Sequence, residues 1–224
     1  VKYVSKKEVS MNINTTYTKI ITGEDLMETA QHGSTLYPFQ FYYEDLSVFD
    51  FNCIEWHWHT ELEFIYIESG TVTLWIGEDQ FHLTEGNGVF INTKVLHRLY
   101  SPSKALIPNF VFMPSFIAPC DSLIYQKYIL PIISSSLPFL VFHKKVCWQA
   151  KVLSIMRQII SAQDSVLSKE LLTSSLLQNL WLEIFENTDI SYQEEHKDHS
   201  TASQARLQLM LQFIHLNYSL SISL

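Results

Sequence analysis

The sequence predicts a mainly β protein, an antiparallel barrel or jelly roll, followed by an α-helical hairpin. Two observations predict this fold class. Short runs of aromatic and β-branched residues recur at near-regular spacing between residues 37 and 113, and residues that favour turns separate them. Beyond residue 143, apolar residues recur instead at the spacing of an amphipathic helix.

Eight runs of the sequence are predicted to form strands. In chain order they cover residues 37–44, 53–59, 61–68, 71–77, 81–83, 88–92, 97–101 and 107–113. Most breaks carry turn-forming residues, as at Ser69-Gly70, Glu85-Gly86-Asn87-Gly88 and Ser101-Pro102-Ser103. In the run 71–77, Val72, Leu74 and Ile76 alternate with Thr71, Thr73 and Trp75, which is typical of a strand buried on one face.

Helical signals follow. Residues 120–130 are predicted to form a short helix, with Asp121 as its N-cap and Pro131 as its stop. Residues 139–142 are expected to return as a last strand. Two longer helical patterns cover residues 148–160 and 172–185, and the loop 163–168 between them ends at Ser168, which can cap the second helix.

Composition excludes several classes of protein. The net charge is −8 and the arginines are Arg98, Arg157 and Arg206, so the chain lacks the clustered cations that bind duplex DNA. Three scattered cysteines without a Cys-x-x-Cys pair predict a reducing compartment. There is no signal peptide pattern and no run of ~20 apolar residues, so a soluble, cytoplasmic protein without membrane contact is expected.

The stretch from residue 54 to residue 97 carries the candidate chemistry. His57, His59 and Glu63 lie at alternate positions, so a strand would place them on one polar wall, and His97 follows further along. Three imidazoles and a carboxylate inside a small barrel could hold a divalent metal. They could equally line a pocket for a polar ligand.

These residues resemble a known family. The pattern His57-x-His59-x-x-x-Glu63 with the later Gly70 resembles the first motif of the cupin barrels, and Gly86 and His97 match half of the second motif. The sequence departs from the cupin pattern at Phe51, Asn92, Lys94 and Ser101. The sequences of residues 55–59, 61–64 and 88–92, together with Leu96-His97, are similar to the sensor domain of AraC/XylS-type transcription regulators.

The resemblance implies a function and a set of sites. It implies a cupin-like double-stranded β-helix that binds a small-molecule effector, with a sugar as one candidate, in a homodimer that is not an enzyme. Expected effector-pocket residues are His57, His59, Glu61, Glu63, Trp75 and His97. If a divalent metal is bound, its ligands are His57, His59, Glu63 and His97; no other cofactor is expected. The expected dimer residues are Leu172, Leu176, Leu180 and Ile184, although the same stripe could simply pack on the barrel wall.

The alternative is a cupin metalloenzyme, such as a dioxygenase or sugar isomerase, that uses the 3-His-1-Glu set at a metal. The altered second motif and the helices after the barrel favour the regulator.

The expected domain organisation has five parts. Residues 1–20 form a flexible arm, 21–142 the sensor barrel, 143–186 the dimerising helical hairpin, and the polar stretch 187–203 a linker. Residues 204–224 resemble the first helix of an AraC-type helix-turn-helix domain, on the string Phe213-Ile214-His215-Leu216-Asn217-Tyr218. The recognition helices are not in this sequence, so promoter DNA is expected to be bound only through a missing C-terminal domain.

Overall fold

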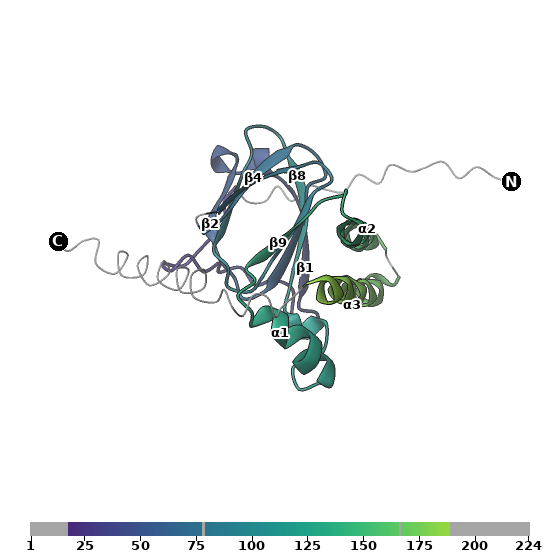
Figure 1. Cartoon of the computed structure of the whole chain (residues 1–224). Helices are drawn as coiled ribbons and strands as arrows, with labels where there is room; N and C mark the ends of the chain where they lie inside the picture. The colour runs from purple at the N-terminus through teal and green to yellow at the C-terminus, as the bar shows by residue number, and fades with distance from the viewer. Residues whose placement is uncertain (1–17, 78, 166, 189–224) are drawn as a thin grey trace.

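The computed structural model describes residues 18–77, 79–165 and 167–188 (Figure 1). Within these residues, nine strands form two antiparallel sheets, one with the order β1-β8-β3-β6-β9 and one with the order β2-β7-β4-β5. The strands are β1 (Phe39–Asp45), β2 (Cys53–His57), β3 (Leu62–Tyr66), β4 (Thr71–Ile76), β5 (Asp79–Thr84), β6 (Gly88–Ile91), β7 (His97–Tyr100), β8 (Leu106–Phe112) and β9 (Phe139–Phe142). The predicted mainly β, cupin-like fold is confirmed.

The two sheets face each other and enclose the inside of the barrel. Side chains at alternate positions of β3 and β8 point inward from the five-stranded sheet, and they meet inward residues of β2, β4 and β7. The resulting inner core includes Ile65, Leu74, Leu99 and Ile107, which are all at most 1% exposed.

The other face of the five-stranded sheet is also buried, because helices cover it. Phe64 stacks on Phe110 with ring centroids 5.3 Å apart, and Phe90, Phe112 and Phe142 join the same cluster. The helices α2 (Cys147–Ala162) and α3 (Lys169–Asn187) pack on this layer of phenylalanines, beside β1 and β9 in Figure 1. Both predicted helices are therefore present, and they form an antiparallel pair on the barrel wall.

The contact between α2 and the sheet is close at Gly88. A Cβ atom at this position would lie 2.8 Å from Cδ2 of Leu153, nearer than ordinary van der Waals contact allows. Glycine at the start of β6 therefore lets α2 lie directly on the sheet.

The leucine stripe of α3 is largely inside the subunit. Leu176, Leu180 and Ile184 are 9%, 1% and 0% exposed and belong to the core between helices and sheet, while Leu172 is 40% exposed. Three of the four expected dimer residues thus already have partners within the chain. The homodimer itself stays a prediction.

The helical segment near residue 130 differs from the prediction. A π-helical turn (Tyr125–Ile129) leads into α1 (Leu130–Ile133), so Pro131 lies inside the helical segment instead of stopping it. Proline is tolerated there because it sits in the first turn of α1, where its missing N–H is not needed. The cap also differs, since the hydroxyl of Ser122 accepts a hydrogen bond from the backbone N–H of Tyr125.

Residues 18–32 lie beside the end of β2 without forming a regular element. The indole N–H of Trp58 donates to the carbonyl of Asp25 at 2.8 Å, and the N–H of Glu28 donates to the carbonyl of Trp58 at 2.9 Å. These bonds hold the segment against the barrel. Residues 1–17, most of the predicted arm, lie outside the described part of the chain. Residues 189–224 also lie outside it, and they include almost all of the predicted linker and the predicted start of the helix-turn-helix domain.

Short 3₁₀ turns complete the described structure at Leu46–Val48, Asp50–Asn52 and Pro114–Phe116. No helix among the described residues is long and apolar enough to cross a membrane.

Candidate functional site

The barrel holds a cavity of about 200 Å³ between its two sheets. Both polar and apolar side chains line it. The polar residues include Glu28, His32, Tyr42, Glu44, His57, His59, Glu63 and Asn109, and the apolar residues include Ile20, Ile54, Ile65, Leu99, Ile107 and Val111. A cavity of this size and composition suits a small ligand that has both polar and apolar groups.

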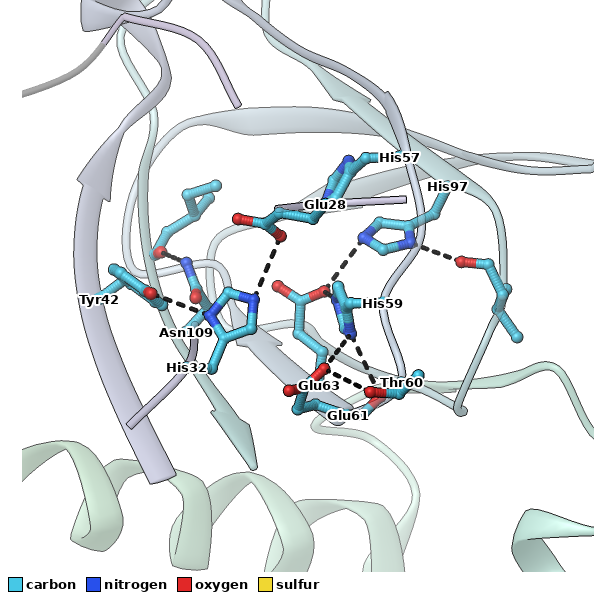
Figure 2. A network of polar contacts seen from close by, with 12 residues as sticks. Glu28, His32, Tyr42, His57, His59, Thr60, Glu61, Glu63, His97 and Asn109 are labelled. Carbon is cyan, nitrogen blue, oxygen red and sulfur yellow. Dashed lines mark hydrogen bonds and ion pairs between the residues drawn. The ribbon is translucent and has the colours of Figure 1, made fainter. Parts of the chain in front are cut away.

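Three histidines meet at one end of the cavity (Figure 2). His57 in β2 and His97 in β7 are direct cross-strand partners, and their ring centroids are 4.1 Å apart. His59 follows β2, and its ring centroid lies 5.4 Å from that of His97. One ring nitrogen from each histidine lies within 4.8 Å of the other two, and all three side chains are buried.

Main-chain carbonyl groups fix the orientation of all three rings. Nδ1 of His57 lies 2.8 Å from the carbonyl oxygen of Glu55, and Nδ1 of His97 lies 2.9 Å from that of Val95. Nδ1 of His59 makes the same kind of contact with the carbonyl of Glu61 at 3.2 Å. A carbonyl oxygen can only accept, so each Nδ1 carries a proton and donates it. In the neutral rings, Nε2 is then the atom with a free lone pair.

Glu63 brings a carboxylate to these nitrogen atoms from the opposite sheet. Its Oε2 atom lies 3.3 Å from Nε2 of His59 and 3.1 Å from Nε2 of His97. The contact with His97 has the distance of an ion pair but not the direction of a hydrogen bond. Glu63 comes from β3 and the histidines from β2, its following loop and β7, so the cluster joins both sheets.

Burial and neighbouring charges set the protonation of this cluster. Burial lowers the pKa of His57 well below 6.5, and the nearby His97 and His59 lower it further. Burial alone would raise the pKa of Glu63, but its contacts with His59 and His97 outweigh burial and hold it well below 4.5. Glu63 is therefore a buried anion, and a buried anion needs a positive partner.

A divalent metal fits this set of donors. The carbonyl partners leave Nε2 of the histidines directed away from the backbone, which is the arrangement that outer partners impose on metal-binding imidazoles. Nε2 of His97 is buried and makes no hydrogen bond within the described residues, and the Glu63 anion lies beside it. His57, His59 and His97 would supply nitrogen ligands and Glu63 an oxygen ligand, a set that suits zinc or another imidazole-preferring ion.

Three residues predicted for the pocket are not part of the cavity wall. His97 belongs to the histidine cluster but does not line the cavity. Trp75 is directed away from the cavity, with the guanidinium of Arg98 5.0 Å from its ring centroid. Glu61 is beside the cluster rather than in the cavity wall, and its Oε2 atom lies 3.9 Å from Nδ1 of His59. The structure brings together His57, His59, Glu63 and His97 from the predicted set.

A second polar group was missing from the sequence prediction (Figure 2). Nδ1 of His32 lies 2.9 Å from the hydroxyl of Tyr42, and its Nε2 lies 3.3 Å from Oε2 of Glu28. Further along the wall, the amide of Asn109 donates to Oε2 of Glu44 at 2.7 Å. Strand alternation could have paired Tyr42 with Glu44 on one face of β1, but residues 18–32 have no periodic pattern that could have revealed Glu28 and His32.

Residues 53–107 match the cupin domain family. The chain contains a cupin domain. The three histidines and Glu63 all lie within the matched residues. The match covers about one quarter of the 224 residues.

A curated relative extends the likeness beyond this domain. An uncharacterised HTH-type transcriptional regulator, YdeC of Bacillus subtilis (strain 168), is 24% identical over 209 residues, covering 91% of this chain and 70% of the relative. The predicted resemblance to a transcription regulator and the predicted cupin domain are thereby confirmed.

Solved structures with a similar arrangement include ToxT and several cupins. A 1.65 Å structure of ToxT from Vibrio cholerae has a TM-score of 0.48 at 14% identity, covering 70% of this chain and 58% of ToxT. An RmlC-like cupin from Shewanella frigidimarina NCIMB 400 has a TM-score of 0.31 at 17% identity, covering 34% of this chain and 67% of that protein. Both TM-scores lie below 0.5.

Proposed function

We propose that this chain is the ligand-sensing part of a bacterial transcription regulator and that its effector binds inside the barrel. The observation that carries the proposal is the cavity lined by both polar and apolar side chains, in a cupin domain whose curated relative is an HTH-type regulator. Such a cavity can bury a small molecule and fix its orientation with a few polar contacts.

The protein is proposed to recognise its effector without converting it. Polar contacts from His57, His59 and the residues around Tyr42 would orient the ligand, and the isoleucines would exclude water from its apolar part. The helices α2 and α3 cover the outer face of the sheet that carries Glu63, so a shift of that sheet upon binding would reach them directly.

DNA binding is proposed to belong to a helix-turn-helix domain of which residues 204–224 form the first part. The supporting observations are the acidic net charge of this chain and the HTH-type description of the relative, of which the chain spans 70%. Residues 204–224 lie outside the described part of the chain.

A homodimer is proposed to form through the outward face of α3. Leu171 and Leu182 lie on this face and are 76% and 50% exposed, in contrast to the buried stripe of Leu176, Leu180 and Ile184. Exposed leucines on one helix face would be covered by a second subunit.

A metalloenzyme is the second candidate, and one observation favours it. The carbonyl contacts of His57, His59 and His97 orient three imidazoles as a metal site requires. A bound metal would supply a Lewis acid at this end of the cavity. The residues of the cavity wall would hold the ligand beside this metal, and the buried anion Glu63 would help to bind the metal.

Binding and turnover measurements separate the two candidates. The purified chain is titrated with a panel of sugars, small acids and small amines by calorimetry, and the same mixtures are followed by NMR for consumption of the compound. We expect a bound compound to be recovered unchanged, and His57→Ala to weaken its binding by ~1–3 kcal/mol, the value of a buried hydrogen bond. The control His82→Ala, on the exposed side of β5, should bind like the wild type. Turnover that His57→Ala and His97→Ala both abolish would reject the sensor in favour of the enzyme.

A further inference from the structure

Carboxylates dominate the polar wall of the cavity. Glu28, Glu44 and Glu63 all line it, and each is largely buried, with the side chains of Glu28 and Glu63 both 8% exposed and Glu44 4% exposed. Among the described residues that line the cavity, Lys19 is the one lysine or arginine, and it is exposed to solvent. The wall therefore presents more negative than positive charge to a ligand.

One of these carboxylates already has a partner, because Nε2 of His32 lies 3.3 Å from Oε2 of Glu28. Burial lowers the pKa of His32 but the adjacent Glu28 outweighs it and raises the value above 6.5, so His32 can compensate one carboxylate at most. The field of the acids also reaches Tyr42, whose pKa is raised first by burial and then by Glu28, Glu44 and Glu63.

The acidic wall contains polar atoms that are placed to meet a ligand. Glu28, His32, Tyr42 and Asn109 lie together on one side of the cavity, away from His97 (Figure 2). Nε2 of His32 lies 3.3 Å from Oε2 of Glu28, Nδ1 of His32 lies 2.9 Å from the hydroxyl of Tyr42, and Oε2 of Glu44 accepts from the amide of Asn109. The carboxylate and hydroxyl oxygens of this group can accept further hydrogen bonds from a ligand.

Apolar side chains line the cavity beside these polar groups, and on β8 Ile107 and Val111 flank Asn109. Ile54, Ile65, Leu99, Ile107 and Val111 line the cavity and are at most 4% exposed. The volume of about 200 Å³ equals that of about seven water molecules. The ligand is therefore small, and its apolar part is of the size of a branched or cyclic hydrocarbon group.

We propose that the effector carries a protonated amino group, held by the carboxylates and hydroxyl around Glu28 and Tyr42, and a short hydrocarbon body against the isoleucines. This proposal deepens the sensor function and rests on it. An ammonium group gains from buried carboxylates that would repel a carboxylate or phosphate ligand. An ammonium group can donate three hydrogen bonds to the acceptor oxygens of the wall, whereas a hydroxyl group can donate only one.

Three probes of nearly equal shape test the charge. They are 3-methylbutylamine, 3-methylbutanol and 3-methylbutanoate, which at neutral pH carry charges of +1, 0 and −1. Calorimetric titrations are made near neutral pH in the presence of EDTA, so that no divalent ion contributes charge at His57, His59 and His97. We expect the amine to bind at least about tenfold more tightly than the alcohol, and the carboxylate to bind most weakly of the three.

Isosteric variants test where the amine binds. Glu28→Gln and Glu44→Gln each remove one charge while keeping an acceptor oxygen, and each should weaken binding of the amine by about tenfold. The matched control is Glu186→Gln, which makes the same change on the exposed surface of α3 and should leave binding unaltered. Circular dichroism melts confirm that each variant is folded, and two separate positions keep the test decisive if one variant does not fold.

The possible outcomes are distinct for the two proposals. Binding of the alcohol or the carboxylate as tightly as the amine would overturn the amine assignment and leave the barrel a ligand-binding domain. Amine binding that neither glutamine variant weakens would also overturn it, as would no binding of the amine. If no sugar, acid or amine of the wider panel binds, the sensor proposal itself falls.

Discussion

Oε2 of Glu63 lies 3.1 Å from Nε2 of His97, although the two residues come from different sheets and both are buried. Nδ1 of His97 already donates its proton to the carbonyl of Val95. The buried carboxylate and the remaining ring nitrogen of His97 therefore meet at one point, where a metal ion would be bound by both.

Acidification is expected to destabilise the barrel. His57 has a lowered pKa in the folded protein, so it remains neutral in the fold but binds a proton in the unfolded chain once the pH falls below about 6.5. Glu63 also has a lowered pKa, so its contribution is present above about pH 4.5 and is lost as the pH falls through its folded value. Both groups thus act in the same direction.

Denaturant unfolding in EDTA at a series of pH values checks this prediction. The free energy of unfolding should be constant around pH 7 to 8, fall below about pH 6.5, and fall again below about pH 4.5. The variant His57→Phe removes the first titrating group and should flatten the first decline. An unchanged decline between pH 6.5 and 5 in His57→Phe would show that His57 is not its source.

Added zinc is expected to bind once per chain at the histidine cluster. The three Nε2 lone pairs and the Glu63 anion form a donor set that zinc prefers, and the Nδ1 contacts already fix the rings. Titration with a chelating indicator should give a stoichiometry of one, and His97→Ala should weaken binding by at least about tenfold. His82→Ala, which lies outside the cluster, should not change it. Equal affinity in wild type and His97→Ala would place any bound zinc elsewhere.

The sequence predicted the centre of the site because strand periodicity determines it. The alternation of polar and apolar residues predicted that His57 and the inward residues of β3 lie on the opposite face from the aromatic residues between them. The turn-forming residues predicted the ends of the strands to within a few positions. The same rule argued against Trp75, since it alternates with the buried Val72, Leu74 and Ile76, and the structure indeed places it on the outer face. Nothing else in the sequence decided its assignment to the pocket.

Other features depend on contacts that a single sequence does not encode locally. Glu28 and His32 reach the cavity from a segment without regular structure, held by hydrogen bonds to Trp58. The helical pattern of α3 identified an apolar stripe, but it could not distinguish a partner subunit from the phenylalanines of the chain's own sheet. That choice depends on the tertiary arrangement of β3, β6, β8 and β9.

Two leucines on opposite sides of α3 should respond differently to a charged substitution. Leu180 is 1% exposed in the core between α3 and the sheet, whereas Leu182 is 50% exposed on the outward face. Leu180→Glu buries an unpaired carboxylate and should cost more than about 4 kcal/mol of the free energy of unfolding. Leu182→Glu should change that free energy by less than about 0.5 kcal/mol in the isolated subunit. Chemical denaturation measures both.

The same pair tests the proposed dimer. Light scattering should give the wild-type chain a mass of about twice 26.1 kDa, and the folded variant Leu182→Glu a mass near that of one chain. A charge placed at an apolar interface is left without water or a partner, so association is lost while the subunit fold is kept. The matched variant Leu182→Ala keeps the face uncharged and should weaken the dimer less. If Leu182→Glu remains dimeric, the outward face of α3 is not the interface, and a monomeric wild type would reject the homodimer altogether.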